Sequence, residues 1–431
     1  MIFALCDCNN FFVSCERLFR PDLAAKPVVV LSSNDGCVIS RSNEAKALGI
    51  AMGVPFFKIA AFLRARGVTA FSSNFALYQE ISRRVMAVLS RFTDRMETYS
   101  VDEAFLSFSI AGLADPVAYA RDIRQAVARD VGIPVSIGIA PTKTLAKLAS
   151  ATAKRHLGAE GVFSTREVAD MDAFLEEVPV QDVWGIGRRC AEALARFGIR
   201  TARRFRDTPD DWLRRHFTVR GVHTAWELRG ISCIRLVEAD PPQKSIEVSR
   251  SFGRTVEDAA ELQEAVAAHA VTAGVRLREQ KAAASVLQVH LSTSRFREGF
   301  FAPAATMRFE IPTSSTPSLI RAALDGLERI YRPGHAFTKA GVALSELHPE
   351  GVVQQRLFDG GKALSREQRE RAFMAAVDEI NRSLGNGALR PALLFGKKRW
   401  APRQDRCSAN PLADFETLAC IASTQSGEEA L

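Results

Sequence analysis

The sequence predicts a multidomain protein of mixed α+β and α/β class, because three parts of the chain show three different patterns. Residues 1–165 alternate short apolar strands with amphipathic helices, residues 183–199 have the pattern of a helical hairpin with a glycine-rich turn, and residues 245–345 follow the order β-α-β-β-α-β. The 431 residues are enough for two to four domains, each with its own core. We place domain boundaries near residues 166, 243 and 352.

In the first part, apolar runs predict strands over residues 2–6, 28–31, 37–40 and 134–140. Amphipathic spacing predicts helices over residues 42–48, 74–92, 116–130 and 142–154, the first of them closed by Gly49. Apolar runs also flank the pair Asp102-Glu103 on both sides, which favours a hairpin with this pair at its tip. Neighbouring residues of a flat strand point to opposite faces, so both carboxylates can bind at one metal centre only if the chain turns or breaks there.

The later parts are predicted from a glycine-rich turn and from alternation. Residues 183–199 are expected to form a helix, a tight turn at Gly185-Ile186-Gly187 and a second helix. Strands are expected over 245–252, near 287–291, near 307–311 and over 340–344, with helices near 258–280 and 317–331. Such a sheet leaves one face open to a ligand. Beyond residue 353 the pattern weakens, apart from a helix near 365–385.

Asp7, Asp102 and Glu103 are the candidate chemical groups. Each follows or ends an apolar, strand-like run, so the three can converge in space. Clustered carboxylates repel one another unless hard cations lie between them, and Mg²⁺ prefers a few carboxylates plus substrate phosphates. Two such ions clamp the attacking and leaving oxygens of a phosphoryl displacement, which indicates nucleotidyl transfer. For each acid alone, a strand-end position in a turn is the simpler interpretation.

The net charge of +8 predicts an anionic partner. The excess is local, because residues 188–206 carry seven arginines against one acid and residues 390–406 carry six basic residues against one acid. On the helix over 142–154, Lys143, Lys147 and Lys154 lie on one side, as a stripe facing phosphates or as a solvated face. The glycine turn at 185–187 is either a phosphate-binding helix start or a structural helical hairpin.

Other classes of protein are disfavoured. No apolar run is long enough to span a membrane, and the apolar start ends after five residues, so no signal peptide is expected. The eight cysteines are spread through the chain without zinc spacing, as in a reduced cytosolic protein. We therefore expect a cytoplasmic protein, associated with the nucleoid when acting and not with a membrane.

Seven segments together resemble the Y-family translesion DNA polymerases, and among these the UmuC type, the catalytic subunit of bacterial DNA polymerase V. They cover residues 1 to about 360 in the order of that family, and they are Ala4–Asp7, Asn34–Ile39, Glu44–Gly49, Phe71–Asn74, Tyr99–Phe105, Thr142–Ala149 and Val183–Arg189. The resemblance implies a right-hand polymerase. Its palm would be residues 1–18 and 74–165, its fingers 19–73, its helical thumb 166–232, its β-α-β-β-α-β little finger 243–352 and its C-terminal extension 353–431.

The same resemblance implies roles for individual residues. Asp7, Asp102 and Glu103 would be the catalytic residues and would hold two Mg²⁺ ions, together with the carbonyl of Cys8. Phe12 would be the steric gate that excludes a ribose 2′-hydroxyl, with a core phenylalanine as the alternative. The incoming dNTP would contact Phe11, Ser40, Asn43, Lys46 and Lys154. The primer–template DNA would contact Lys143, Lys147, Gly185, Ile186, Gly187, Arg188, Arg189 and Arg250.

Two departures from the family pattern stand out. Ser107 occupies a position where Asp is usual, and Lys46 stands where several relatives have Arg, so a bidentate phosphate contact becomes a point charge. Neither position belongs to the acidic triad, so we expect activity to survive both.

The resemblance also implies partners. The segment 354–358 is similar to the peptide that docks polymerases on the sliding clamp, with Gln354, Leu357 and Phe358 as anchors, although Gln355 replaces a usual Leu and short matches arise by chance. The tail beyond residue 360 is similar to the UmuC extension, which implies contact with a UmuD′-like dimer and with RecA filaments. The expected activity is error-prone translesion synthesis in the SOS response to DNA damage.

Two other functions compete with this interpretation. A catalytically inert DNA-binding accessory protein on the same scaffold would typically lose the acidic triad, which is complete here. A nucleotidyl cyclase also uses acidic residues and Mg²⁺ on a palm-like fold. The cyclase interpretation gives no function to the basic thumb, the helical hairpin or the little finger.

Overall fold

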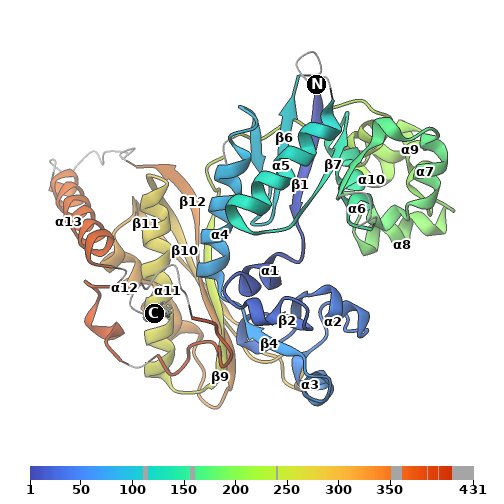
Figure 1. Ribbon diagram of the computed structural model, residues 1–431. Helices are drawn as coiled ribbons and strands as arrows, with labels where there is room; N and C mark the ends of the chain where they lie inside the picture. The colour runs from blue at the N-terminus through green and yellow to red at the C-terminus, as the bar shows by residue number, and fades with distance from the viewer. Residues whose placement is uncertain are drawn as a thin grey trace, which may run out of the picture. The chain divides into compact units, whose positions relative to one another are not determined.

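The computed structural model describes residues 1–109, 115–155, 161–238, 241–350, 362–385, 387–396 and 398–409 (Figure 1). The chain divides into two compact units. The first unit comprises Met1–Ser32, Gly36–Asp240 and the chain from Arg406 onward, and the second comprises Ser33–Asp35 and Pro241–Asp405. The two units are described separately below. No helix in the described part of the chain combines the length and the apolar character needed to cross a membrane.

A five-stranded sheet of order β5-β6-β1-β7-β8 forms the centre of the first unit. Strand β1 lies in its middle, antiparallel to β6 on one side and to β7 on the other, and β8 runs parallel to β7. Strands β5 and β6 form the predicted hairpin. The strands are β1 (Ile2–Cys8), β5 (Met96–Thr98), β6 (Glu103–Phe108), β7 (Val135–Ala140) and β8 (Val162–Ser164).

The alternation of β1 separates two cores. Its even-numbered apolar residues pack with α4 (Phe75–Leu89) and α5 (Pro116–Val131), whereas Phe3 and Leu5 pack with α6 (Lys143–Arg155). Asp7 therefore belongs to the α6 side of the sheet, because side chains of a strand alternate with a period of two. Helix α6 approaches β7 closely at Gly138, where a Cβ would lie 2.0 Å from a backbone nitrogen of the helix.

A second, three-stranded sheet of order β3-β2-β4 lies in the same unit, and its central strand is the predicted β-branched run. Helix α1 follows β1 directly through Asn10, whose backbone is left-handed (φ 49°). Such a conformation is open chiefly to Gly, Asn and Asp. The elements are α1 (Phe11–Leu18), η1 (Pro21–Leu23), β2 (Val28–Leu31), η2 (Ser33–Asp35, in the second unit), β3 (Val38–Arg41), α2 (Asn43–Ala47), α3 (Phe56–Ala65) and β4 (Thr69–Ser72).

The segment from Thr165 to Leu228 is mainly helical, as the family resemblance implied, and shares an apolar core with α6. The prediction of two α-helices around the glycine turn is only half right. The element before the turn is a single 3-10 turn, because Pro179 and the short span to Val183 leave no room for a longer helix. The helices are η4 (Thr165–Glu167), α7 (Met171–Glu177), η5 (Val180–Asp182), α8 (Arg188–Arg196), α9 (Ala202–Arg206) and α10 (Asp210–Leu228).

The second unit contains the predicted β-α-β-β-α-β arrangement, as an antiparallel sheet of order β11-β10-β12-β9. Helix α11 packs on β9 and β12, and α12 packs on β10 and β11, so both helices cover one face. Strand β10 starts earlier than predicted because Ala282–Ala284 gives no alternation. The elements are β9 (Ile246–Val256), α11 (Ala259–Glu279), β10 (Ala282–Ser292), β11 (Ala304–Thr313), α12 (Thr316–Ile330), β12 (Phe337–Pro349), α13 (Lys362–Leu384) and η6 (Ala392–Leu394).

Candidate active site

The backbone brings the three predicted acids to one edge of the five-stranded sheet. Asp7 of β1 lies directly opposite Glu103, the first residue of β6. Asp102 lies in the turn before β6, and its carbonyl accepts a hydrogen bond from the N–H of Cys8 at 2.9 Å. The hairpin tip thus presents Asp102 and Glu103 beside the end of β1, which is the convergence that the sequence predicted.

Each acid has a specific polar partner. Lys154 of α6 forms an ion pair with Asp7, and Lys147 of the same helix bonds to Glu103 at 2.9 Å. Asp102 accepts a hydrogen bond from the hydroxyl of Ser100 at 2.7 Å. Both lysines lie on α6, seven residues or about two turns apart, so one helix supplies the positive charge that offsets the clustered carboxylates.

The electrostatics of this cluster are unusual. Burial raises the pKa of Asp7 to about 7, and the neighbouring Glu103 adds to this rise, although Lys154 opposes it. Asp7 is only 8% exposed, so water screens these interactions weakly. Buried, interacting titratable groups of this kind are typical of functional sites.

The residues present suit a hard divalent cation. Asp7, Asp102 and Glu103 supply only oxygen donors, which is the ligand set of Mg²⁺. In the described ranges, no three His, Cys, Asp or Glu side chains are arranged to enclose a metal ion. The three carboxylates have Lys154, Ser100 and Lys147 as partners. A metal would replace these partners on carboxylates that the backbone already holds together.

Phe12, the predicted steric gate, lies in the first turn of α1, five residues after Asp7. It is only partly buried, and its ring stacks on that of Tyr78 with 4.6 Å between centroids and 19° between planes. Phe75 contacts the same ring edge-on at 6.2 Å. The side chain is therefore held from one side by aromatic neighbours. Phe11, by contrast, is 3% exposed and belongs to the core.

Three of the predicted nucleotide-contacting residues gather around Asn10, which the sequence analysis did not single out. Asn10 donates from its side-chain amide to Asn43 at 3.1 Å and accepts from Lys46 at 2.6 Å. The hydroxyl of Ser40 lies 3.4 Å from its carbonyl. Burial lowers the pKa of Lys46, and the nearby cations Arg41 and Lys154 lower it further. Mutually repelling cations beside the acids provide a binding region for an anion.

The DNA-contact prediction for Lys143 is wrong in this arrangement. Its ammonium is buried, with 2% side-chain exposure, and forms an ion pair with Glu97 at 2.6 Å. It also lies over the rings of Phe105 (4.5 Å) and Trp184 (5.4 Å). Lys147 likewise faces Glu103 and the ring of Tyr99. The lysine stripe of α6 therefore serves carboxylates and aromatic rings, because the helix packs on β7 and β1 and its lysines reach the neighbouring strands β5 and β6.

The glycine turn is exposed at Gly185, Gly187, Arg188 and Arg189. Ile186 is an exception, because its side chain is buried and its N–H bonds to the carbonyl of Val183 at 3.0 Å. The prediction that Ile186 contacts DNA is therefore corrected to a packing role. Arg250 lies exposed on β9 of the second unit. The predicted clamp-docking residues Gln354, Leu357 and Phe358 lie outside the described residues.

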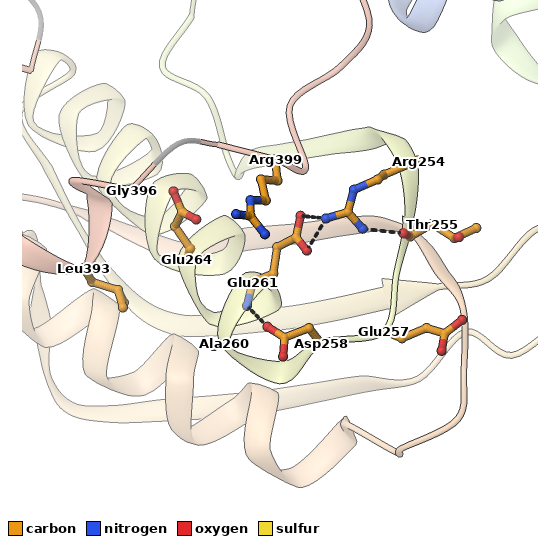
Figure 2. Close-up of a pocket in the computed structure, with 10 residues that line it drawn as sticks. All are labelled: Arg254, Thr255, Glu257, Asp258, Ala260, Glu261, Glu264, Leu393, Gly396 and Arg399. Carbon is orange, nitrogen blue, oxygen red and sulfur yellow. Dashed lines mark hydrogen bonds and ion pairs between the residues drawn. The ribbon is translucent and has the colours of Figure 1, made fainter.

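The second unit contains a cavity of about 770 Å³ between α11 and the segment around Gly396 (Figure 2). Within its lining, Arg254 bonds to both carboxylate oxygens of Glu261 at 2.6 and 2.7 Å and to the carbonyl of Thr255 at 3.0 Å. Asp258 accepts from the N–H of Glu261 as the helix cap. None of the predicted site residues lines this cavity.

Comparison with known proteins identifies the family. The impB/mucB/samB family matches residues 6–151, its C-terminal domain matches 243–357, and the HHH motif of the IMS family matches 168–199. Protein UmuC of Salmonella typhimurium is 39% identical over 97% of this chain and 99% of its own length. The chain belongs to the impB/mucB/samB family. It is a UmuC-like translesion DNA polymerase of the Y family, and such polymerases typically use divalent metal ions.

One further relative supports the same family, and two solved structures support the fold. DNA polymerase IV of Desulfatibacillum aliphaticivorans is 30% identical over 90% of this chain and 95% of its own. A solved Y-family DNA polymerase chimera of Dbh and Dpo4 is 21% identical, covers 81% of this chain and all of its own, and has a TM-score of 0.65. The insertion ternary complex of Dbh DNA polymerase has a TM-score of 0.53 at 20% identity, with 81% and 100% covered. Residues 371–421 match a domain of unknown function, DUF4113.

Proposed function

We propose that this chain extends a DNA primer past damaged template bases by two-metal nucleotidyl transfer, with Asp7, Asp102 and Glu103 as the metal-holding residues. The observation that carries the proposal is the placement of Asp7 opposite Glu103 with Asp102 beside Cys8. Two Mg²⁺ ions, when bound, would lower the pKa of the primer 3′-hydroxyl and neutralise the leaving pyrophosphate. The carbonyl of Cys8 is the expected additional ligand.

The lysines of α6 supply the charge balance. While Asp7 and Glu103 hold no metal, Lys154 and Lys147 offset their charge. Released from Asp7, Lys154 would become available to the triphosphate of the incoming dNTP, beside Lys46, Ser40 and Asn43. Lys154 would then exchange one anionic partner, the carboxylate, for another, the phosphate. Its charge would stay paired, so nucleotide binding would require little rearrangement of the charged side chains.

Sugar selection is assigned to Phe12. Its ring is partly exposed on α1, and α1 follows β1 after the two-residue turn at Asn9-Asn10. The short connection fixes the ring relative to Asp7, so a ribose 2′-hydroxyl would meet the ring while the α-phosphate is at the acids. Phe11, which is buried, would support the turn and take part in nucleotide binding through its backbone.

DNA and protein partners complete the proposal. The exposed Gly185, Gly187, Arg188 and Arg189 would contact backbone phosphates, with Arg250 of the second unit as a further contact, so binding would show little sequence preference. The clamp peptide at 354–358 and the UmuC-type tail would recruit a sliding clamp, a UmuD′-like dimer and a RecA filament. The protein would act in the cytoplasm, on the nucleoid, during the SOS response.

Primer extension tests the proposal on damaged and undamaged templates with Mg²⁺ and dNTPs. We expect Asp102→Ala to reduce extension by about 100-fold or more, as expected when charge stabilisation of the transition state is lost. Phe12→Ala should incorporate ribonucleotides while still extending with dNTPs. Asp94→Ala, which removes an exposed aspartate before the same hairpin, is the matched control and should extend normally.

Partner dependence is tested by repeating the assay with sliding clamp, UmuD′-like protein and RecA filament. A wild-type protein that binds primer–template but extends nothing under these conditions would refute the catalytic assignment and favour an accessory DNA-binding role. Extension by Asp102→Ala at the wild-type rate would refute the metal-holding role of the triad.

A further inference from the structure

A buried carboxylate lies behind the aromatic stack of Phe12. Glu16 follows Phe12 by one helical turn on α1 and is 2% exposed. It accepts a hydrogen bond of 2.6 Å from the hydroxyl of Tyr78, the residue whose ring stacks on Phe12. Tyr78 is itself fully buried. The orientation of the Tyr78 ring, and with it the position of the Phe12 ring, thus depends on how Glu16 is held.

The C-terminal segment Arg406–Ser408 supplies part of that support. The hydroxyl of Ser408 hydrogen-bonds to the Glu16 carboxylate. Asn74, the cap residue of α4, donates from its side-chain amide to both the carbonyl and the hydroxyl oxygen of Ser408, each at 3.2 Å. The same Asn74 caps the N–H of Leu77 at 3.2 Å. Ser408 therefore contacts both elements that carry the stack, α1 through Glu16 and α4 through Asn74.

The segment is anchored at its other end as well. Arg406 and Ser72 exchange two hydrogen bonds: the N–H of Ser72 donates to the Arg406 carbonyl at 3.1 Å, and the N–H of Arg406 donates to the Ser72 hydroxyl at 2.9 Å. The Arg406 guanidinium lies over the ring of Phe56 at 4.7 Å. Ser72 and Asn74 are buried, so the segment covers groups that would otherwise face water. These contacts hold the segment against the end of β4.

We propose that Arg406–Ser408 is an intramolecular docking segment that positions the steric gate, with Ser408 holding Glu16, Glu16 holding Tyr78 and Tyr78 holding Phe12. The segment falls within the span that matches a domain of unknown function, and this assigns a role to part of that domain. The proposal rests on the assignment of Phe12 as the steric gate. Ser408, Glu16 and Tyr78 are positioning residues, since they act on the sugar only through Phe12.

The physical reason lies in the cost of an incompletely bonded buried carboxylate. Burial raises the pKa of Glu16, whereas the hydrogen bonds from Tyr78 and Ser408 lower it. A buried acceptor that loses a donor retains its full desolvation cost, so the surrounding side chains move to satisfy it. Without the Ser408 hydroxyl, the Glu16 carboxylate would shift, and the Tyr78 hydroxyl that donates to it would follow. The Tyr78 ring would then leave the position in which it stacks on Phe12.

The test compares variants of the full-length chain. Ser408→Asp places a second carboxylate beside Glu16 and should displace the segment, Ser408→Thr keeps the hydroxyl, and Ala409→Asp adds the same charge at an exposed neighbouring position. The first measurement is hydrogen exchange of the amides of α1 and of the first turn of α4, which needs no activity. In Ser408→Asp we expect these amides to exchange about tenfold faster, which corresponds to the free energy of one hydrogen bond to a charged group. Ser408→Thr and Ala409→Asp should exchange at the wild-type rate.

The second measurement is the ratio of dNTP to rNTP incorporation in primer extension. Ser408→Asp should lower this ratio by roughly tenfold while still extending with dNTPs, and Tyr78→Phe should also lower it. Ser408→Thr should keep the wild-type ratio. Unchanged exchange in Ser408→Asp would overturn the docking segment, and an unchanged ratio despite faster exchange would overturn its action on the gate. If Phe12→Ala also leaves the ratio unchanged, the steric-gate assignment itself fails, and the exchange result still decides whether the segment docks.

Discussion

Replacing Lys143 by Met should destabilise the first unit and leave DNA binding intact. Lys143 and Glu97 form an ion pair of 2.6 Å, with 2% and 9% of their side chains exposed. In the variant, the partner that Glu97 would keep among the described residues is the N–H of Val237, which donates to it at 2.7 Å. Breaking one partner of a buried pair leaves an uncompensated charge and costs about 3–5 kcal/mol.

The contribution of the pair itself is separated by a double variant. Methionine at both positions removes the buried charges together, and such replacements are often close to neutral. We therefore expect Lys143→Met with Glu97→Met to recover most of the stability that Lys143→Met loses. Lys26→Met, at an exposed lysine of the same unit, is the control and should change stability by less than about 0.5 kcal/mol.

Urea unfolding followed by circular dichroism and fluorescence measures the stabilities, and DNA affinity at several salt concentrations measures phosphate contacts. Loss of a phosphate contact lowers the salt slope by about one unit, whereas loss of a buried ion pair does not. A Lys143→Met variant with wild-type stability and a reduced salt slope would refute the buried pairing and restore the lysine to the DNA interface.

Two further predictions concern the second unit. Burial lowers the pKa of His269 to about 4 in the folded protein, against about 6.5 when unfolded, so the unfolded chain binds the proton first as pH falls. The free energy of unfolding of this unit should decline by up to about 3 kcal/mol as the pH falls from about 6.5 to 4. His269→Leu should make this decline shallower when unfolding is measured at several pH values. A decline that stays steep in the variant would exclude His269 as its source. Arg278 makes two hydrogen bonds, of 2.6 and 2.8 Å, to Asp378 of α13, and Asp378→Asn should weaken them by roughly 1–2 kcal/mol. The amides of α13 should then exchange faster than in the wild type, while those of α12 should not. Wild-type exchange in α13 of the variant would show that other contacts hold this helix.

Strands and helices with a clear periodicity were predictable, whereas α1, α3, β4 and α10 were not predicted from the sequence. Apolar runs located β1 and the β5–β6 hairpin, and the turn between the runs explained how Asp102 and Glu103 reach one centre. The convergence with Asp7 followed from strand ends alone. The β-α-β-β-α-β unit was likewise visible as alternation and helical spacing, apart from the alanine start of β10, which has no pattern to detect.

The partners of individual side chains were not predictable. A helical wheel places Lys143 and Lys147 on one side of α6, but it does not say whether phosphate or a buried carboxylate faces that side. Glu97 reaches Lys143 across the sheet, and Ser408 reaches Glu16 from the far end of the sequence. Such pairings are set by tertiary packing, and the local sequence around one partner does not indicate which residue the other partner is.

The alternation of β1 has a consequence for how this protein can vary. Its even positions fill one core and its odd positions face α6, so the face on which Asp7 lies is set by the register of β1 against β6 and β7. Exchanging one apolar residue for another changes only local fit. Inserting or deleting one residue would turn Asp7 into the core beneath α4 and α5 and bring a neighbour to the acids. Lineages of this protein can therefore diverge in the composition of the strand, but not by a single residue in its length.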